Sequence, residues 1–212
     1  MYKKNRTQVI LSIFFFILFG LGISLQLKAA IGQSILNALA VTISQGVQMK
    51  VGFVLNIINS LFFISYLLLR HKKLETKDGI QIAATVLNGY IINFFLYSIL
   101  LAWTPGTYPH RLLLYFSGLI LASISLGAVL AIGLVKFPLE SLCLTISEKY
   151  SKNFSRVRMT FDGLFLAAAL IFSFVYKLPL EIREGTLISI LLLSPLLGIC
   201  YNYFKNLFTS EE

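Results

Sequence analysis

Residues 30–44 read AIGQSILNALAVTIS, and residues 133–147 read GLVKFPLESLCLTIS. Shifted by 103 residues, the two segments share two leucines and a Thr-Ile-Ser triplet, and Asn37 falls on Glu140. Each segment belongs to an amphipathic stretch, 34–46 or 138–149, that is too short to cross a hydrocarbon core of about 30 Å. We therefore expect two half-helices, or re-entrant segments, at these places.

Six longer apolar segments surround the two short ones. Each is about 20 to 25 residues long, which is the length that a membrane span requires. They lie at 8–30, 51–70, 79–103, 112–134, 158–177 and 185–207. Of the 212 residues, 57% are hydrophobic and 13% charged, and the mean hydropathy is +0.82. A soluble globule is excluded, because soluble domains carry about twice that share of charged residues. We predict an all-α membrane protein whose residues 1–212 form a single membrane domain.

The order of the segments is the same in both halves of the chain: span, half-helix, span, span. After a slip of three residues, the offset of 106 aligns Asn56 with Asp162 and Gly79 with Gly185. Three spans per half is an odd number, so the two copies of a duplicated unit must have opposite orientations in the membrane. The sequence thus predicts two inverted three-span repeats, at about 8–103 and 112–207, an architecture known from secondary transporters.

The distribution of basic residues predicts the orientation. With the amino terminus inside, the outer face keeps Lys28, Lys50, Arg111, Lys177 and Arg183, and the other 13 of the 18 Lys and Arg residues fall inside. Since basic residues are in excess on the cytoplasmic side, we expect both termini in the cytoplasm. The basic start, MYKKNR, precedes an apolar run that is too long for a signal peptide, so an uncleaved first span is expected.

A family resemblance rests on a span rich in small residues and on the entrances to the two short helices. The residues are Gly20, Gly22 and Ser24 in the span, Gly32 to Asn37 at the first entrance, and Pro138 with Glu140 at the second. In these features the chain resembles the YczE/YitT group of bacterial integral membrane proteins, over most of its length. The resemblance implies a multi-pass protein of the bacterial plasma membrane with a poorly defined activity.

The polar residues at the two short helices are the first candidates for a binding site. Glu140 follows Pro138 in a first helical turn, where an acid stabilises the helix dipole. Alternatively, Glu140 and its counterpart Asn37 face a shared cavity and bind a proton, a cation or a cationic substrate. Gln33 and Lys136 precede the two helices, and with the helix N-termini they suit a carboxylate or phosphate. The simpler interpretation of Lys136 is a side chain that snorkels to the interface.

The second pair of candidates lies at matched positions on the spans that follow. Asp162 inside an apolar span costs about 2.5–3.5 kcal/mol unless it is paired or hydrated. Arg158, four residues earlier, could neutralise Asp162 locally, and this alternative weighs as much as a site role. Asn56, at the matched position, forms either a paired polar site or a plain interhelical hydrogen bond.

Several classes of function are disfavoured by what the sequence contains. We find no catalytic motif, so an enzyme is the least favoured class, and no cofactor is expected. Cys143 and Cys200 lie in apolar stretches without metal-ligand spacing, which makes a zinc site or a disulfide framework unlikely. The net charge of +9 is explained by contact with anionic headgroups of the lipid bilayer rather than with nucleic acid.

The function that the sequence favours is a permease for a small solute or ion. The solute would bind between the two short helices, with Glu140 and Asp162 as carriers of a proton or cation. One alternative is a substrate-binding membrane subunit that needs an energising partner, and another is a scaffold or accessory protein that transports nothing. Each of these three functions is compatible with a homodimer, in which two copies of the chain pair through faces of small residues.

Overall fold

The computed structural model describes residues 6–70, 75–135 and 137–209, which form helices and no strand. The helices are α1 (Arg6–Ala29), α2 (Ile35–Val47), α3 (Val51–Arg70), α4 (Thr76–Phe94), α5 (Tyr108–Ile132), α6 (Pro138–Lys149), α7 (Phe154–Tyr176) and α8 (Glu184–Thr209). A π-helical turn, η1 (Phe95–Ile99), continues α4. The two short helices, α2 and α6, are those that the sequence predicts, and the predicted range 138–149 coincides with α6.

Six helices within the described part of the chain are long and apolar enough to cross a membrane. They correspond to the six predicted spans, with ends that differ by up to four residues. The largest shifts, of four residues, are at the starts of α5 and α7 and at the end of the third span, which is Ile99 instead of residue 103. Helix α5 begins at Tyr108 with Pro109 in its first turn, and α7 begins at Phe154 because the Asn153 side chain accepts a hydrogen bond from Ser155 N at 2.8 Å.

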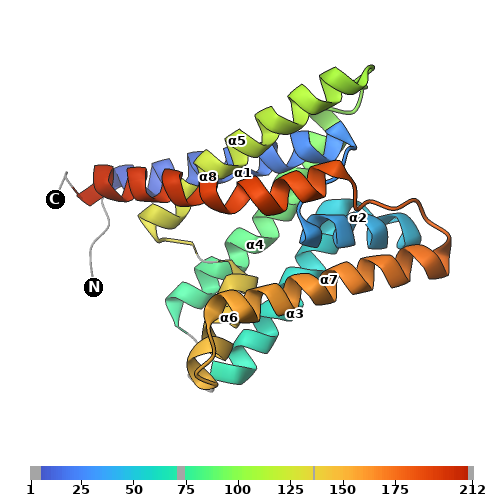
Figure 1. Cartoon of the computed structure of the whole chain (residues 1–212). Coiled ribbons are helices and arrows are strands. Elements are labelled where there is room, and N and C mark those ends of the chain that lie inside the picture. The colour runs from blue at the N-terminus through green and yellow to red at the C-terminus, as the bar shows by residue number, and fades with distance from the viewer. Residues whose placement is uncertain (1–5, 71–74, 136, 210–212) are drawn as a thin grey trace.

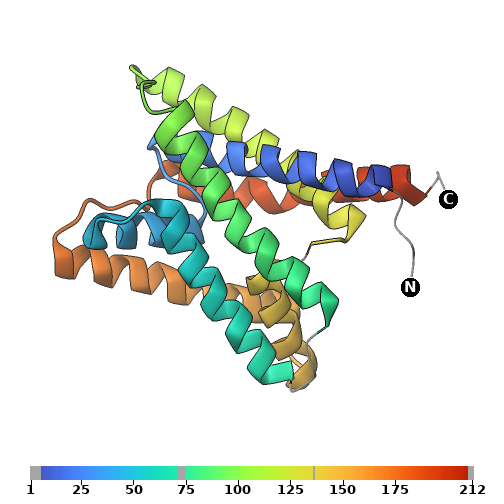
Figure 2. The ribbon, with the colours of Figure 1, turned by 180° about the vertical axis from the view of Figure 1, so that it is seen from behind.

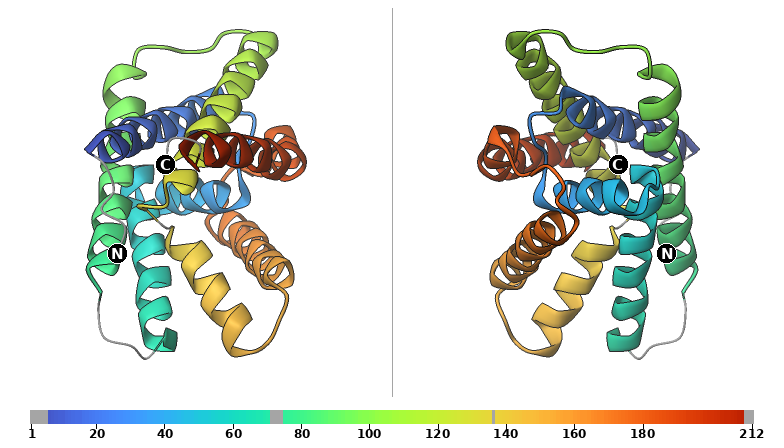
Figure 3. Two further views of the ribbon diagram at one scale, coloured as in Figure 1. Left: turned by 90° about the vertical axis from the view of Figure 1, so that its left-hand side faces the viewer. Right: turned by 90° about the vertical axis from the view of Figure 1, so that its right-hand side faces the viewer.

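The helices form two groups with α2 between them (Figures 1 and 3). Helices α1, α5 and α8 pack together on one side of α2, and α3, α6 and α7 lie on the other. Seen from behind, α4 runs alongside α3 and reaches α1 (Figure 2). The described start of α1 and the described end of α8 lie at the same end of the molecule (Figure 1), as an even number of crossings requires.

Small residues allow the long helices to approach closely. A Cβ atom on Gly22 would lie 2.7 Å from the backbone nitrogen of Ala122, where α1 crosses α5. At the α5–α8 crossing, a Cβ atom on Gly127 would lie 2.7 Å from Cys200 Cβ. Of the small residues noted in the sequence, Gly22 thus allows close packing between helices of the same chain.

The outward surfaces of the long helices are apolar. Large hydrophobic side chains are exposed along α7, including Ile171 and Phe174, and along α8, including Leu191 and Ile199. Exposed apolar area of this extent is unfavourable in water and favourable in lipid. The exposed apolar surface and the six long apolar helices together are characteristic of a multi-pass membrane protein.

Candidate functional site

A cavity of about 190 Å³ lies where the eight α-helices meet, and each of them contributes lining residues. The polar side chains of its lining are Gln26, Ser34, Asn37, Asn59, Asn88, Glu140 and Arg158. The rest of the lining is apolar, with leucines from five helices and Phe19 and Phe137. We call this space the central cavity. It combines a small volume with a few convergent polar groups, as ligand sites in helical bundles do.

Both short helices begin at the central cavity. Ser34 precedes α2 and accepts a hydrogen bond from Asn37 N at 3.4 Å. Helix α6 begins with Pro138, which needs no hydrogen-bond partner for its backbone nitrogen. The preceding long helices end close by, through Ala30 and Gly133 in left-handed conformation (φ of 54° and 66°). The first turns of both short helices, with their N-terminal N–H groups, therefore lie at the same cavity inside the protein.

Three charged side chains form a cluster at the wall of the cavity. Arg158 Nη1 lies 3.0 Å from Glu140 Oε1, and Arg158 Nε lies 3.4 Å from Asp162 Oδ1. The i, i+4 contact with Asp162 is the one that the sequence suggested as an alternative to a site role. The contact with Glu140 joins α6 to α7. Two carboxylates share one guanidinium group, so the cluster carries one net negative charge.

The predicted site residues do not all meet at this place. Asn37 and Glu140 line the central cavity, and Asp162 reaches it through Arg158. Gln33 is buried outside the lining, and its backbone N–H donates to Thr186 Oγ1 at 3.3 Å.

Asn56 lies on the contact between α3 and α4 and donates to Val86 O at 3.0 Å. This hydrogen bond is the interhelical alternative that the sequence left open for Asn56. Lys136 lies outside the described residues. For Asn88 the sequence left a packing role and a pore-facing role open, and it gave no site role to Asn59. A carboxamide inside an apolar span is the available signal for both.

A second, wider cavity of about 950 Å³ adjoins the central cavity, and we call it the vestibule. The two share Leu130, Phe137 and Glu140 in their linings. The vestibule lies where α3 and α6 end and α7 begins, since Arg70, Lys149 and Phe154 line it. The Phe137 ring packs against Phe19 with ring centroids 5.5 Å apart. Phe137 thus stands between the two cavities.

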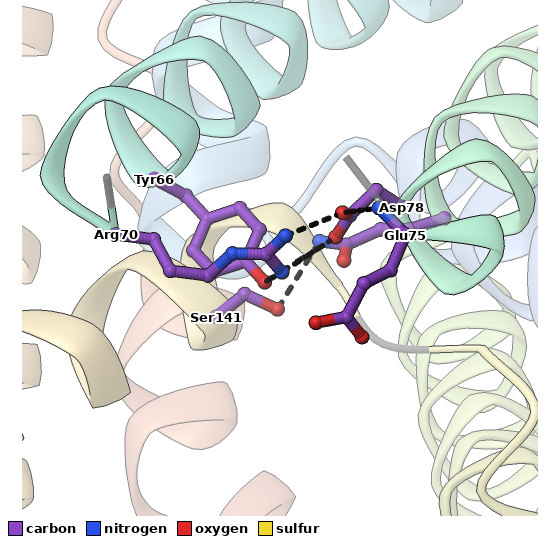
Figure 4. Close-up of polar contacts among 6 residues, drawn as sticks. Tyr66, Arg70, Glu75, Asp78 and Ser141 are labelled. Atoms are coloured by element: carbon purple, nitrogen blue, oxygen red, sulfur yellow. Dashed lines mark hydrogen bonds and ion pairs between the residues drawn. The ribbon is translucent and has the colours of Figure 1, made fainter. Parts of the chain in front are cut away.

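A buried ion pair stabilises the rim of the vestibule (Figure 4). Arg70 donates through two nitrogens to the two carboxylate oxygens of Asp78, at 2.9 and 2.7 Å. Tyr66 Oη donates to the same carboxylate at 3.3 Å, and Glu75 N donates at 2.8 Å. These bonds connect the end of α3 to the start of α4. The sequence alone does not single out Arg70, which is one of the 13 basic residues expected on the inner face.

At the opposite end of the molecule, the break between α1 and α2 is bound to the start of α8. Gly185 N donates to Ile31 O at 2.8 Å, and Arg183 Nη1 donates to Ala30 O at 2.8 Å. Tyr115 Oη bonds to Gly185 O and lies 2.6 Å from Ser189 Oγ. We call this set of contacts the clamp.

Only glycine fits at the centre of the clamp. Gly32 has a φ of +106°, which side chains rarely tolerate, and a Cβ atom there would lie 2.8 Å from Thr186 N. The clamp therefore keeps the N-terminal end of α2 close to α8.

Comparison with known proteins gives a family and no further relative. A family model described as a family of unknown function, DUF6198, matches residues 6–202. No curated protein and no solved structure matches the chain. Because the model covers most of the sequence, the chain belongs to this family.

Proposed function

We propose that this member of DUF6198, a family of unknown function, is a membrane permease that moves a small solute through the central cavity. The observation that carries the proposal is a cavity with convergent polar groups, lined by each α-helix of the described residues, at which both short helices begin. A cavity that served only as a packing defect would be apolar and dry. Polar groups from several helices, buried in a lipid-facing protein, are typical of a solute path.

We propose further that the chain consists of two inverted repeats, at about 8–103 and 112–207. Paired hydrogen bonds support this: Thr42 and Thr145 each donate to the carbonyl four residues earlier. Ser44 and Ser147 each donate to the carbonyl five residues later. The packing is also exchanged between halves, since α2 lies against α7 and α3 against α6.

The two ends of the proposed path differ in a way that transport by alternating access would produce. Gly185 is closely packed in the clamp, where a Cβ atom would lie 2.7 Å from Gly32 O. Gly79, its counterpart in the repeat alignment, would have nothing within 4 Å of its Cβ atom. The wide vestibule lies at the same end of the protein as Gly79, because Arg70 in its lining pairs with Asp78 at the start of α4. We interpret the structure as the state that is open to the vestibule and closed at the clamp.

In this proposal, the cluster of Glu140, Arg158 and Asp162 couples transport to a proton or cation. Arg158 contacts both carboxylates, and their side chains keep 47% and 31% exposure. A cation or proton that occupied one carboxylate would release Arg158 toward the other. The surplus negative charge of the cluster is what such an ion would balance.

We also propose kinship with the YczE/YitT group and a place in the bacterial plasma membrane. Cytoplasmic termini are supported by the excess of basic residues, 13 of 18, that this orientation puts inside. The vestibule would then open to the cytoplasm.

Flux into proteoliposomes tests the function. Purified protein is reconstituted and exposed to a panel of amino acids, organic acids, amines and sugars, and uptake is followed with labelled solutes. We expect uptake of at least one class, and its loss in Glu140→Gln with unchanged yield of folded protein. Glu181→Gln is the matched control, because Glu181 lies in the loop before α8 and contacts Gln45 instead. Uptake of nothing by well-folded wild-type protein would refute the permease and favour the scaffold.

A further inference from the structure

The charged cluster leaves one carboxylate oxygen at the central cavity unpaired. Glu140 and Arg158 both line the cavity, and Arg158 Nη1 lies 3.0 Å from Glu140 Oε1. Arg158 Nε lies 3.4 Å from Asp162, so one guanidinium group is shared between two carboxylates. Glu140 Oε2 accepts no hydrogen bond from the described residues. The cluster therefore keeps one surplus negative charge, and Glu140 presents it to the cavity.

This surplus charge decides the sign of the ligand. An anion at Arg158 would have to displace a carboxylate that is already bound, and it would add to the surplus. The partial positive charges at the starts of α2 and α6 are spread over several N–H groups, whereas the surplus is concentrated on carboxylate oxygens. A monovalent cation in contact with Glu140 balances the cluster and leaves Arg158 to pair with Asp162.

The wall beside Glu140 suits an organic cation better than a metal ion. Phe137 and Phe19 both line the cavity, and their rings form a corner with an interplanar angle of 67°. An aromatic face attracts a cation within about 6 Å of its centre, and quaternary ammonium groups are recognised in this way. Most of the other lining side chains are apolar and supply no oxygen ligand to a metal ion. Alkyl groups on a nitrogen would pack against them.

Gln26 carries an acceptor that the protein leaves without a partner. Gln26 is 4% exposed and lines the central cavity. Its amide Nε2 donates to Gly22 O of the same helix at 3.5 Å, whereas its Oε1 accepts no hydrogen bond from the described residues. This oxygen is not fully enclosed, so its accessible side faces the cavity. A ligand with an O–H or N–H group would satisfy this buried acceptor.

The distance along α1 limits the size of the ligand. Gln26 follows Phe19 by seven residues, which is two turns and about 10 Å of helix. A cation lies within about 6 Å of an aromatic centre, and an O–H···O hydrogen bond spans about 2.8 Å. These two contacts leave a few ångströms between the nitrogen and the donor. The cavity volume of about 190 Å³, equal to roughly six water molecules of about 30 Å³ each, limits the ligand to a few carbon atoms.

We infer that the central cavity binds a small monovalent amino alcohol of the choline type. Its ammonium nitrogen lies between Glu140 and the corner of Phe19 and Phe137, and its hydroxyl donates to Gln26 Oε1. The inference rests on the proposed function, because it takes the central cavity as the solute site. The cation that balances the cluster is then the solute itself. A proton on Glu140 would exclude this cation, which is the coupling that the proposed function requires.

Choline and three analogues test the inference. The thermal midpoint of the purified full chain in detergent is titrated with each compound at constant ionic strength. The analogues are the uncharged isostere with carbon in place of nitrogen, ethyltrimethylammonium, which lacks the hydroxyl, and betaine, which has a carboxylate instead. A ligand that binds the folded state raises the midpoint according to its affinity. We expect choline to bind most tightly, ethyltrimethylammonium about five-fold more weakly, and the other two not at all.

Two variants locate the binding. Glu140→Gln removes the surplus charge and should weaken both cations alike, by about ten-fold or more. Gln26→Leu removes the acceptor at nearly constant volume, so it should weaken choline about five-fold and leave ethyltrimethylammonium unchanged. Glu181→Gln, in the loop before α8, is the matched control and should bind both cations like wild type. Should Glu140→Gln fail to fold, Gln26→Leu still tests the site, because a general loss of stability would affect both cations equally.

The outcomes separate the inference from the proposed function. Equal midpoint rises with choline and with its uncharged isostere or betaine would overturn the cation site and leave the permease standing. Unchanged choline affinity in the folded cavity variants would also overturn it. Uptake of another solute by proteoliposomes, without any effect of choline, would refute the inference alone. If no probe changes the midpoint and no solute is taken up, the inference and the proposed function fail together.

Discussion

The change Asp78→Asn tests the buried ion pair at the rim of the vestibule. The Asp78 side chain is 4% exposed, and it accepts hydrogen bonds from Arg70, Tyr66 and the backbone of Glu75. Asparagine has nearly the same shape, but it removes the charge and directs an amide donor toward the donors of Arg70. The change therefore isolates the electrostatic contribution from packing.

The expected loss of stability follows from the burial of the pair. Removing one partner of a buried ion pair costs about 3–5 kcal/mol. The Arg70 side chain keeps 14% exposure, so some hydration remains and we expect the lower end, about 3 kcal/mol. For a chain of this length, each kcal/mol lowers the thermal midpoint by about 2–4 °C. We therefore expect a decrease of about 6–12 °C.

A native cysteine provides the assay. Cys143 is fully buried, so its thiol reacts with a fluorogenic maleimide only after unfolding. The measurement uses a Cys200→Ala background, which removes the partly exposed second thiol. Glu148→Gln is the matched control, since the same chemical change at an exposed carboxylate should move the midpoint by less than about 2 °C. A decrease for Asp78→Asn no larger than that of the control would refute the reasoning.

The same thiol assay and one labelling experiment check three further predictions. Gly89→Ala should cost about 1–3 kcal/mol, because its Cβ would overlap a backbone carbonyl of α3, whereas Gly163→Ala, with nothing within 4 Å, should be neutral or slightly stabilising. Equal midpoints for the two would contradict the packing. Tyr115→Phe removes the hydroxyl contacts with α8 and should cost about 1–3 kcal/mol; an unchanged midpoint would count against the clamp. Phe137→Ala should speed the labelling of Asn37→Cys by water-soluble reagents, and an unchanged rate would show that Phe137 does not separate the cavities.

The candidate site was predictable where it depends on the short helices themselves. Asn37 and Glu140 line the central cavity because each lies in the first turn of a helix that begins inside the protein. Gln33 is buried in the segment before α2, where its backbone N–H donates to Thr186 of α8, and the Asn56 side chain on α3 donates to a backbone carbonyl of α4. A shift of one residue turns a helical side chain by about 100°, and which face meets the cavity depends on neighbours that hydropathy does not identify.

The sequence by itself determined the helices, their approximate ends and the two breaks. These features depend on local properties: apolar runs of spanning length, Pro138 at a helix start and glycine at positions of positive φ. Only the tertiary structure decided that Arg158 joins Glu140 to Asp162 and that Arg70 pairs with Asp78 across two helices. Apart from the i, i+4 contact, these pairs depend on the rotation and register of packed helices, which arise from close packing of whole surfaces and not from any one segment.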